Sequence, residues 1–168
     1  MRLFTAFLLS EEMKDALTDA QEQLRAQGVK GNYSARENLH VTLAFIGEYP
    51  DPEEVLGALE TVSFRPVRFS LDGMGAFGDL WWAGLSGAPA LEAVAKKVRR
   101  SLSDAEIPFD RKRFRAHVTL LRRASAQTIP PVGIPPVSMT ADRISLMRSD
   151  RGKAGMIYTE IGSVPADR

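Results

Sequence analysis

The four residues His-Val-Thr-Leu occur twice in this chain, at His40–Leu43 and at His117–Leu120, and the two copies contain both of its histidines. Successive side chains of a β-strand point to opposite faces. In each copy the histidine and threonine would therefore share one face, and the valine and leucine the other. Each copy is predicted to bury an apolar pair in its sheet and to present a titratable ring beside a hydroxyl. Two such strands, related by an internal near-twofold axis, would bring two histidines and two threonines into one cleft.

Chance is a poor explanation for this repeat. If each residue type makes up about 5–10% of an average protein, a given histidine is followed by Val-Thr-Leu less than roughly once in a thousand cases. A single copy would be read more simply, as a core histidine with satisfied hydrogen bonds beside an ordinary strand threonine. The presence of two copies favours a shared functional site.

The residues of the repeat suit acid–base catalysis on a phosphate, with His40 and His117 as the catalytic pair. An imidazole pKa of about 6.5 allows one ring to be neutral and the other protonated at physiological pH. The neutral ring can deprotonate water, and the protonated ring can protonate a leaving oxygen. Thr42 and Thr119 would donate hydrogen bonds to the non-bridging phosphate oxygens. Arg122, near the end of the second strand, is a candidate for a charge-assisted phosphate contact, the alternative being a surface arginine without a role.

The rest of the chain predicts a mixture of helices and strands without regular βαβ alternation, which favours an α+β fold with largely antiparallel sheets. Ser10 is the expected N-cap of a first helix that ends at Gly28, and Asp51-Pro52 is expected to open a second helix. A third helix is expected at 89–103. The expected strands are 3–8, 39–46, 67–71, 81–85, 114–121, 143–148 and 156–161.

Composition limits the class of protein. The chain has no cysteine, which excludes disulfides and thiolate metal sites, and two histidines are a poor inventory for zinc. The apolar run at 3–9 is too short for a secretory signal or a membrane span, so a cytoplasmic protein is expected. Residues 1–168 are expected to form one domain. Residues 96–123 carry 10 basic and 3 acidic side chains, which points to an anionic partner, although a solvated helix face followed by a charged loop would look the same.

With these motifs in place, the chain resembles the two-histidine (2H) phosphoesterases. Within that superfamily it is most similar to the RNA 2′,3′-cyclic phosphodiesterases, historically called 2′-5′ RNA ligases (the LigT-like group). The segments Glu37–Gly47 and Phe114–Arg122 resemble the two motif blocks of the family. Met1–Phe7 resembles its first strand, and Ser149–Tyr158 its C-terminal strand pair. One departure is Ala116, where the family usually has proline.

The resemblance implies two pseudo-symmetric lobes of antiparallel sheet, with outer helices, around a central cleft. His40 would be the proton donor to the leaving 3′ oxygen, and His117 the proton acceptor that activates water. Thr42 and Thr119 match the phosphate-contacting threonines of the family. The implied reaction uses neither metal nor cofactor and converts an RNA 2′,3′-cyclic phosphate end, or a cyclic nucleotide, into a 2′-phosphate.

Other features are given structural interpretations. The run Gly73–Gly78 formally matches a dinucleotide-binding motif, but a strand-like segment follows it, so we interpret it as a turn between strands. At most one of the adjacent residues Trp81 and Trp82 can face a cleft, and core packing is favoured for them. Phe45 and Phe114 lie nearer the motifs and are the candidates for base stacking.

Two alternatives stay open at this point. The same site would also suit a 2′-5′ oligonucleotide phosphodiesterase, another cyclic nucleotide ester hydrolase such as one for ADP-ribose 1″,2″-cyclic phosphate, or weak 2′-5′ ligation. An interpretation of another class is a non-catalytic RNA-binding module that uses the basic 96–123 region and survives loss of either histidine. A monomer is expected, because nothing in the sequence indicates an obligate assembly.

Overall fold

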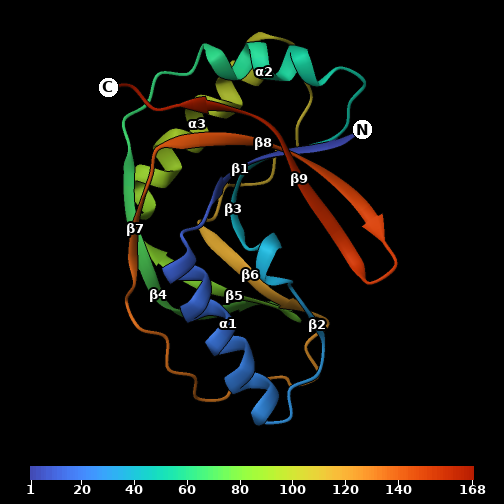
Figure 1. The fold of residues 1–168 in the computed structure, drawn as a ribbon, viewed down its shortest axis with the longest axis vertical. Helices are drawn as coiled ribbons and strands as arrows, with labels where there is room; N and C mark the ends of the chain where they lie inside the picture. Colours follow the sequence, from blue (N-terminus) through green and yellow to red (C-terminus); the bar gives the residue numbers. More distant parts are fainter.

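Two antiparallel sheets organise the computed structural model, which describes residues 1–168 (Figure 1). The first, named here the His40 sheet, has four strands in the order β3-β1-β8-β9. The second, the His117 sheet, has five strands in the order β2-β6-β5-β4-β7. The His40 sheet consists of β1 (Arg2–Leu8), β3 (His40–Glu48), β8 (Arg143–Gly152) and β9 (Gly155–Pro165). The His117 sheet consists of β2 (Asn32–Tyr33), β4 (Val67–Phe77), β5 (Leu80–Ser86), β6 (His117–Arg122) and β7 (Ser138–Ala141).

The strand orders of the two sheets correspond. The order β3-β1-β8-β9 corresponds to the order β6-β5-β4-β7, so the two strands that begin with a histidine, β3 and β6, are equivalent. Strand β2 is an extra edge strand beside β6. The connections correspond too, because a helix links β1 to β3 and another links β5 to β6. The strands β3 and β6 contact each other where the two sheets meet, in the middle of the molecule (Figure 1). The expected fold of two antiparallel lobes with outer helices is confirmed.

Three α-helices flank the sheets: α1 (Glu11–Ala26), α2 (Pro52–Glu60) and α3 (Ala88–Asp104). The hydroxyl of Ser10 accepts a hydrogen bond from the Met13 N–H at 3.2 Å, which confirms the predicted N-cap of α1. The carboxylate of Asp51 caps α2 in the same way. None of these helices has the length and apolar composition required to cross a membrane.

The two longer helices cross between the lobes. Helix α1 follows β1 of the His40 sheet but lies beside the His117 sheet, where the Gln21 amide donates to the Leu120 carbonyl oxygen at 2.9 Å. Helix α3 follows β5 of the His117 sheet but packs against β3 of the other sheet as well as against β4. Helix α2 contacts α3, β8 and β9. Each lobe is therefore covered partly by a helix that the other lobe introduces (Figure 1).

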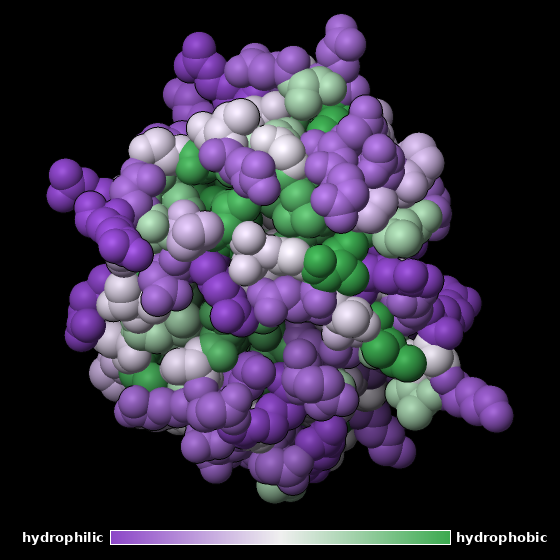
Figure 2. Space-filling view, turned by 45° about the horizontal axis from the view of Figure 1, so that its top comes forward, coloured by the Kyte–Doolittle hydropathy of each residue, from purple (hydrophilic) through white to green (hydrophobic).

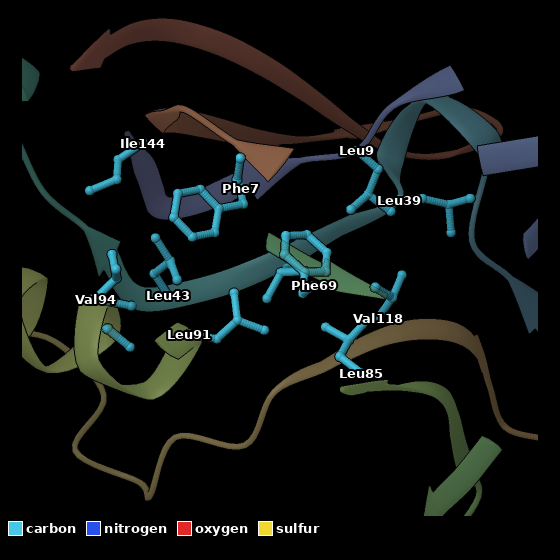
Figure 3. Close-up of a cluster of buried hydrophobic side chains, with 14 of the residues drawn as sticks. Phe7, Leu9, Leu39, Leu43, Phe69, Leu85, Leu91, Val94, Val118 and Ile144 are labelled. Atoms are coloured by element: carbon cyan, nitrogen blue, oxygen red, sulfur yellow. The ribbon is translucent and has the colours of Figure 1, made fainter. Parts of the chain in front are cut away.

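One continuous core of 36 buried residues includes side chains from both sheets and from the helices (Figure 3). The apolar members of the two tetrapeptides belong to it, and Leu43 and Val118 have no exposed surface. Phe7 and Phe69, from the two sheets, and Leu91 from α3 lie in the same cluster. The predicted burial of the valine and leucine of each repeat is confirmed, and it leaves the histidine and threonine on the opposite face.

The glycine-rich run departs from the sequence prediction. Residues 73–77 continue strand β4, and the turn between β4 and β5 comes only at Gly78 and Asp79. Packing explains Gly75, since a Cβ atom there would lie 2.2 Å from the indole of Trp82, whereas Gly73 and Gly78 adopt a positive φ that favours glycine. The short strands β2 and β7 were not predicted, and β6 begins at His117, three residues later than expected. A two-residue and a four-residue strand give too little alternation to recognise in a sequence.

Candidate active site

His40 is the first residue of β3, and both of its ring nitrogens have partners. Nδ1 lies 2.7 Å from the backbone carbonyl oxygen of Asn38. Because a carbonyl oxygen only accepts, Nδ1 carries the proton, and in the neutral ring Nε2 has the free lone pair. The hydroxyl oxygen of Thr42 lies 2.8 Å from Nε2 and donates to it in that state. The two polar residues of the first repeat thus contact each other directly.

His117 is the first residue of β6 and is held in the same way. Its Nδ1 lies 2.6 Å from the carbonyl oxygen of Arg115, again the residue two positions earlier in the chain. Its Nε2, by contrast, has no hydrogen-bond partner within the protein, and neither has the hydroxyl of the half-buried Thr119. The backbone therefore fixes the same tautomer in both histidines, and Nε2 is the reactive nitrogen in each.

Both histidines favour the neutral state. Burial lowers the pKa of His40 and of His117 below the usual histidine value, because removing an imidazolium from water is unfavourable. The backbone carbonyl bonds partly oppose this effect. The positive charge of Arg122 lowers the pKa of both rings further, and the charge of His117 lowers that of His40. Arg122 is the residue that its position at the end of the strand made a candidate phosphate contact. Its positive charge acts on both histidines.

Aromatic rings surround each histidine, and the sequence prediction missed most of them. The ring centroid of His40 lies 4.9 Å from that of Phe4 and 5.4 Å from that of Tyr158. The ring centroid of His117 lies 5.4 Å from that of Phe77 and 6.2 Å from that of Trp82. These rings come from other strands of the same sheets, β1 and β9 for His40 and β4 and β5 for His117, and not from the motifs themselves. The only signal in the sequence was that aromatic residues recur in those strands.

Trp81 and Trp82 point to opposite faces of β5, as adjacent residues of a strand do. Trp81 belongs to the core and is 1% exposed, whereas Trp82 lies on the His117 side, opposite Thr119 in the β5–β6 pairing. The indole N–H of Trp82 is buried and has no hydrogen-bond partner. The expectation that at most one of the two faces the cleft side agrees with this arrangement, while core packing applies only to Trp81.

The two phenylalanines proposed for base stacking occupy different environments. A β-bulge between Thr5 and Ala6 in the β1–β3 pairing shifts the alternation, so that Phe45 falls on the same side as Thr42. There it packs against a small apolar cluster that includes Phe4, and the Arg2 guanidinium lies 5.0 Å from its ring centroid. Phe114 instead packs against the main core and lines a surface hollow near the beginning of α3. No aromatic contact joins Phe114 to His117.

The surface near the histidines contains uncovered apolar side chains. Phe77 is 37% exposed and Met156, two residues before Tyr158, is 36% exposed. Figure 2 shows hydrophobic residues spread across the middle of one face of the molecule and hydrophilic residues around its margin. No group of three or more His, Asp or Glu side chains comes together in an arrangement that would hold a metal ion.

Comparison with known proteins agrees with this fold. Residues 9–153 match the family model described as the 2′-5′ RNA ligase superfamily. A Thermus thermophilus protein named RNA 2′,3′-cyclic phosphodiesterase is 33% identical over 95% of this chain and 87% of its own length. A Thermotoga maritima protein of the same name is 27% identical over 94% of this chain and 91% of its own length. The crystal structure of Escherichia coli LigT complexed with 3′-AMP superposes with a TM-score of 0.84 at 25% identity, covering 99% of this chain and 98% of that one.

The fold is that of a two-histidine phosphoesterase of the LigT type. The chain belongs to the 2′-5′ RNA ligase superfamily. The names of its relatives support a cyclic phosphodiesterase function.

Proposed function

We propose that this protein is an RNA 2′,3′-cyclic phosphodiesterase that uses His40 and His117 as an acid–base pair and needs no metal. A water molecule attacks the phosphorus atom, and the bond from phosphorus to the 3′ oxygen breaks. The water proton passes to Nε2 of His117, and the proton on Nε2 of His40 passes to the 3′ oxygen. The product carries a 2′-phosphate and a 3′-hydroxyl.

The proposal is carried by one observation, the duplicated anchoring of the two imidazoles. In each, a backbone carbonyl binds Nδ1 and leaves Nε2 for the substrate. Nε2 of His117 has no protein partner and its pKa is lowered, which suits a base that must be neutral before it accepts a proton. Nε2 of His40 is held by Thr42, and the negative charge of a bound phosphate would favour the protonated ring that an acid requires.

Phosphate binding in this scheme falls to three side chains. The unpartnered hydroxyl of Thr119 donates to one non-bridging oxygen, and Thr42 donates to another once the His40 ring is protonated. Arg122, whose charge acts on both histidines, supplies the compensating positive charge. The three groups stabilise the negative charge that develops on the phosphorus oxygens in the transition state.

The relatives and the aromatic surroundings support an RNA or nucleotide substrate. The curated relatives are named for activity on RNA, and the E. coli neighbour was crystallised with an adenine nucleotide. Every nucleobase has a π-face that stacks on aromatic rings. Tyr158, Phe77 and Phe45 lie on the histidine side of their sheets and are the rings we assign to the terminal base and its neighbour, with Phe114 as a more remote candidate.

The test is hydrolysis of a 2′,3′-cyclic nucleotide and of a short RNA with a 2′,3′-cyclic phosphate end, both in excess EDTA. We expect turnover in EDTA, a 2′-phosphate product, and a bell-shaped dependence of rate on pH. A requirement for a divalent metal, or exclusive formation of the 3′-phosphate, would contradict the mechanism. If neither substrate reacts but RNA binding survives loss of either histidine, the chain acts as a binding module.

A further inference from the structure

Asn38 and Arg115 occupy equivalent positions in the two halves of the site. Each lies two residues before a histidine, and each accepts a hydrogen bond from that histidine's Nδ1 through its backbone carbonyl, at 2.7 Å and 2.6 Å. Neither side chain belongs to the repeated tetrapeptide. The two residues differ in size and charge, so no sequence similarity marks them as a pair.

The side chain of Asn38 makes a second connection on the His40 side. Its amide nitrogen Nδ2 donates to the backbone carbonyl oxygen of Met156 at 2.8 Å, in strand β9. Two residues further along β9 is Tyr158, whose ring meets the rings of His40 and Phe4 edge-on, with centroid distances of 5.4 Å and 5.0 Å. Asn38 thus holds the histidine with its backbone and the strand that bears the adjacent aromatic ring with its side chain.

Arg115 makes the corresponding connection on the His117 side by other chemistry. Its guanidinium carbon lies 5.3 Å from the ring centroid of Phe77, a cation–π contact, and this arginine forms no ion pair. The Phe77 ring in turn lies edge-on to His117 at 5.4 Å. In both halves, therefore, one residue contacts the histidine through its carbonyl and the neighbouring aromatic ring, or its strand, through its side chain.

We propose that Asn38 and Arg115 are paired positioning residues, each of which fixes one imidazole between its own backbone carbonyl and an aromatic ring that its side chain holds in place. The Nδ1 hydrogen bond by itself leaves each ring free to tilt about it; the aromatic neighbour limits this tilt in both halves, and at His40 the Thr42 hydroxyl on Nε2 adds to the restraint. The Nε2 of each histidine is then aimed in one direction, which an in-line displacement requires. The catalytic part of this inference rests on the proposed function; the positioning part does not.

The experiment reads each imidazole by ¹⁵N NMR in the substrate-free protein, at alkaline pH where both rings are neutral. The chain has two histidines, so the spectrum contains two ring systems, assigned with His40→Gln and His117→Gln. We expect Asn38→Ala to shift the ring signals of His40 and leave those of His117 unchanged, and Arg115→Ala to do the reverse. The matched controls are Glu37→Ala and Arg113→Ala, exposed neighbours whose side chains form no hydrogen bond or ion pair, and both should leave the two rings unchanged.

Kinetics supply the second readout. We expect Asn38→Ala and Arg115→Ala each to lower kcat by roughly 10- to 100-fold, the scale on which misplacement of a reacting group acts, with a smaller change in KM. Arg115→Lys keeps a cation over Phe77 and should restore most of the rate. If Asn38→Ala unfolds, Asn38→Asp keeps the shape of the side chain while removing its N–H donor, and its His40 signals should shift in the same way.

The outcomes separate the two proposals. Unchanged ring signals in Asn38→Ala and Arg115→Ala would overturn the positioning role, even if the wild type hydrolyses cyclic phosphates. Equal shifts at both histidines in either variant would also overturn it, because they would indicate a general loosening of the fold. An inactive wild type whose rings nevertheless respond selectively would refute the proposed function and leave the positioning role intact.

Discussion

The two halves of the site share a tetrapeptide, a strand position and a backbone anchor, yet the two histidines experience different surroundings. The Nδ1 bond of His40 is partly buried and its Nε2 is bonded to Thr42, whereas the Nδ1 bond of His117 is exposed and its Nε2 is free of protein partners. A duplicated sequence thus creates the pair, and the neighbours from other strands make its members unequal. Unequal members are what an acid–base pair needs, because one must hold a proton while the other accepts one.

Removal of either imidazole should have the largest effect. We expect His40→Ala and His117→Ala each to lower kcat by about 10²–10⁴-fold or more, the amount attributed to a positioned acid or base. The measurement is cyclic-phosphate hydrolysis by variants whose circular dichroism and Tm match the wild type. A variant that keeps most of the activity would show that its histidine is not part of the reaction, and the two histidines could then not be an acid–base pair.

Substitution of the two threonines should have different effects on the titration of the neighbouring histidine. Thr119→Val removes a hydroxyl with no protein partner, so we expect kcat to fall by about 10²-fold, the lower end of what loss of one transition-state donor costs, without a change in the titration of His117. Thr42→Val should reduce kcat and also change the pKa of His40, since it removes the bond to Nε2. NMR titration of both rings in both variants measures this difference. Identical titration of His40 with and without the Thr42 hydroxyl would contradict the inequality of the two halves.

Packing around the His117 half can be tested with two glycines. A methyl group at Gly75 would collide with the Trp82 indole, so Gly75→Ala should lower the unfolding free energy by about 1–3 kcal/mol. It should also shift the ring signals of His117 more than those of His40. Gly57 in α2 has open space at its Cβ, and Gly57→Ala should stabilise the protein by about 0.5–1 kcal/mol. Urea denaturation and the ring spectra measure both. Equal tolerance of the two substitutions would show that Trp82 is free to move.

The smallest expected effect is the dependence of stability on pH. Both histidines have a lowered pKa in the folded protein, whereas in the unfolded chain the value is about 6.5. Between these values the unfolded chain binds more protons, so the unfolding free energy should fall as the pH decreases below about 6.5. Comparing His40→Gln and His117→Gln with the wild type isolates this contribution from that of the carboxylates. We expect each substitution to reduce the slope below about pH 6.5, and an unchanged slope in either variant would contradict the lowered pKa of that histidine.

Much of the fold was predictable because its signals are local. The helices α1, α2 and α3 were found from apolar spacing and from the caps Ser10 and Asp51, whose hydrogen bonds involve residues two or three positions away. The longer strands were found from alternation. The short strands β2 and β7 exist because strands far away in the chain, β6 and β4, pair with them. The glycine run is part of β4 because it pairs with β5, where Gly75 leaves room for the indole of Trp82.

The candidate site divides in the same way. The repeated tetrapeptide alone identified the two histidines, the threonines two residues after them and the burial of the valines and leucines, because the period of a strand places them. Folding places the aromatic rings that flank each imidazole, turns Phe45 towards the His40 side through a bulge, and lets the charge of Arg122 act on both rings. The pKa of each histidine likewise depends on burial and on charges brought close by folding, and no spacing along the chain encodes those distances.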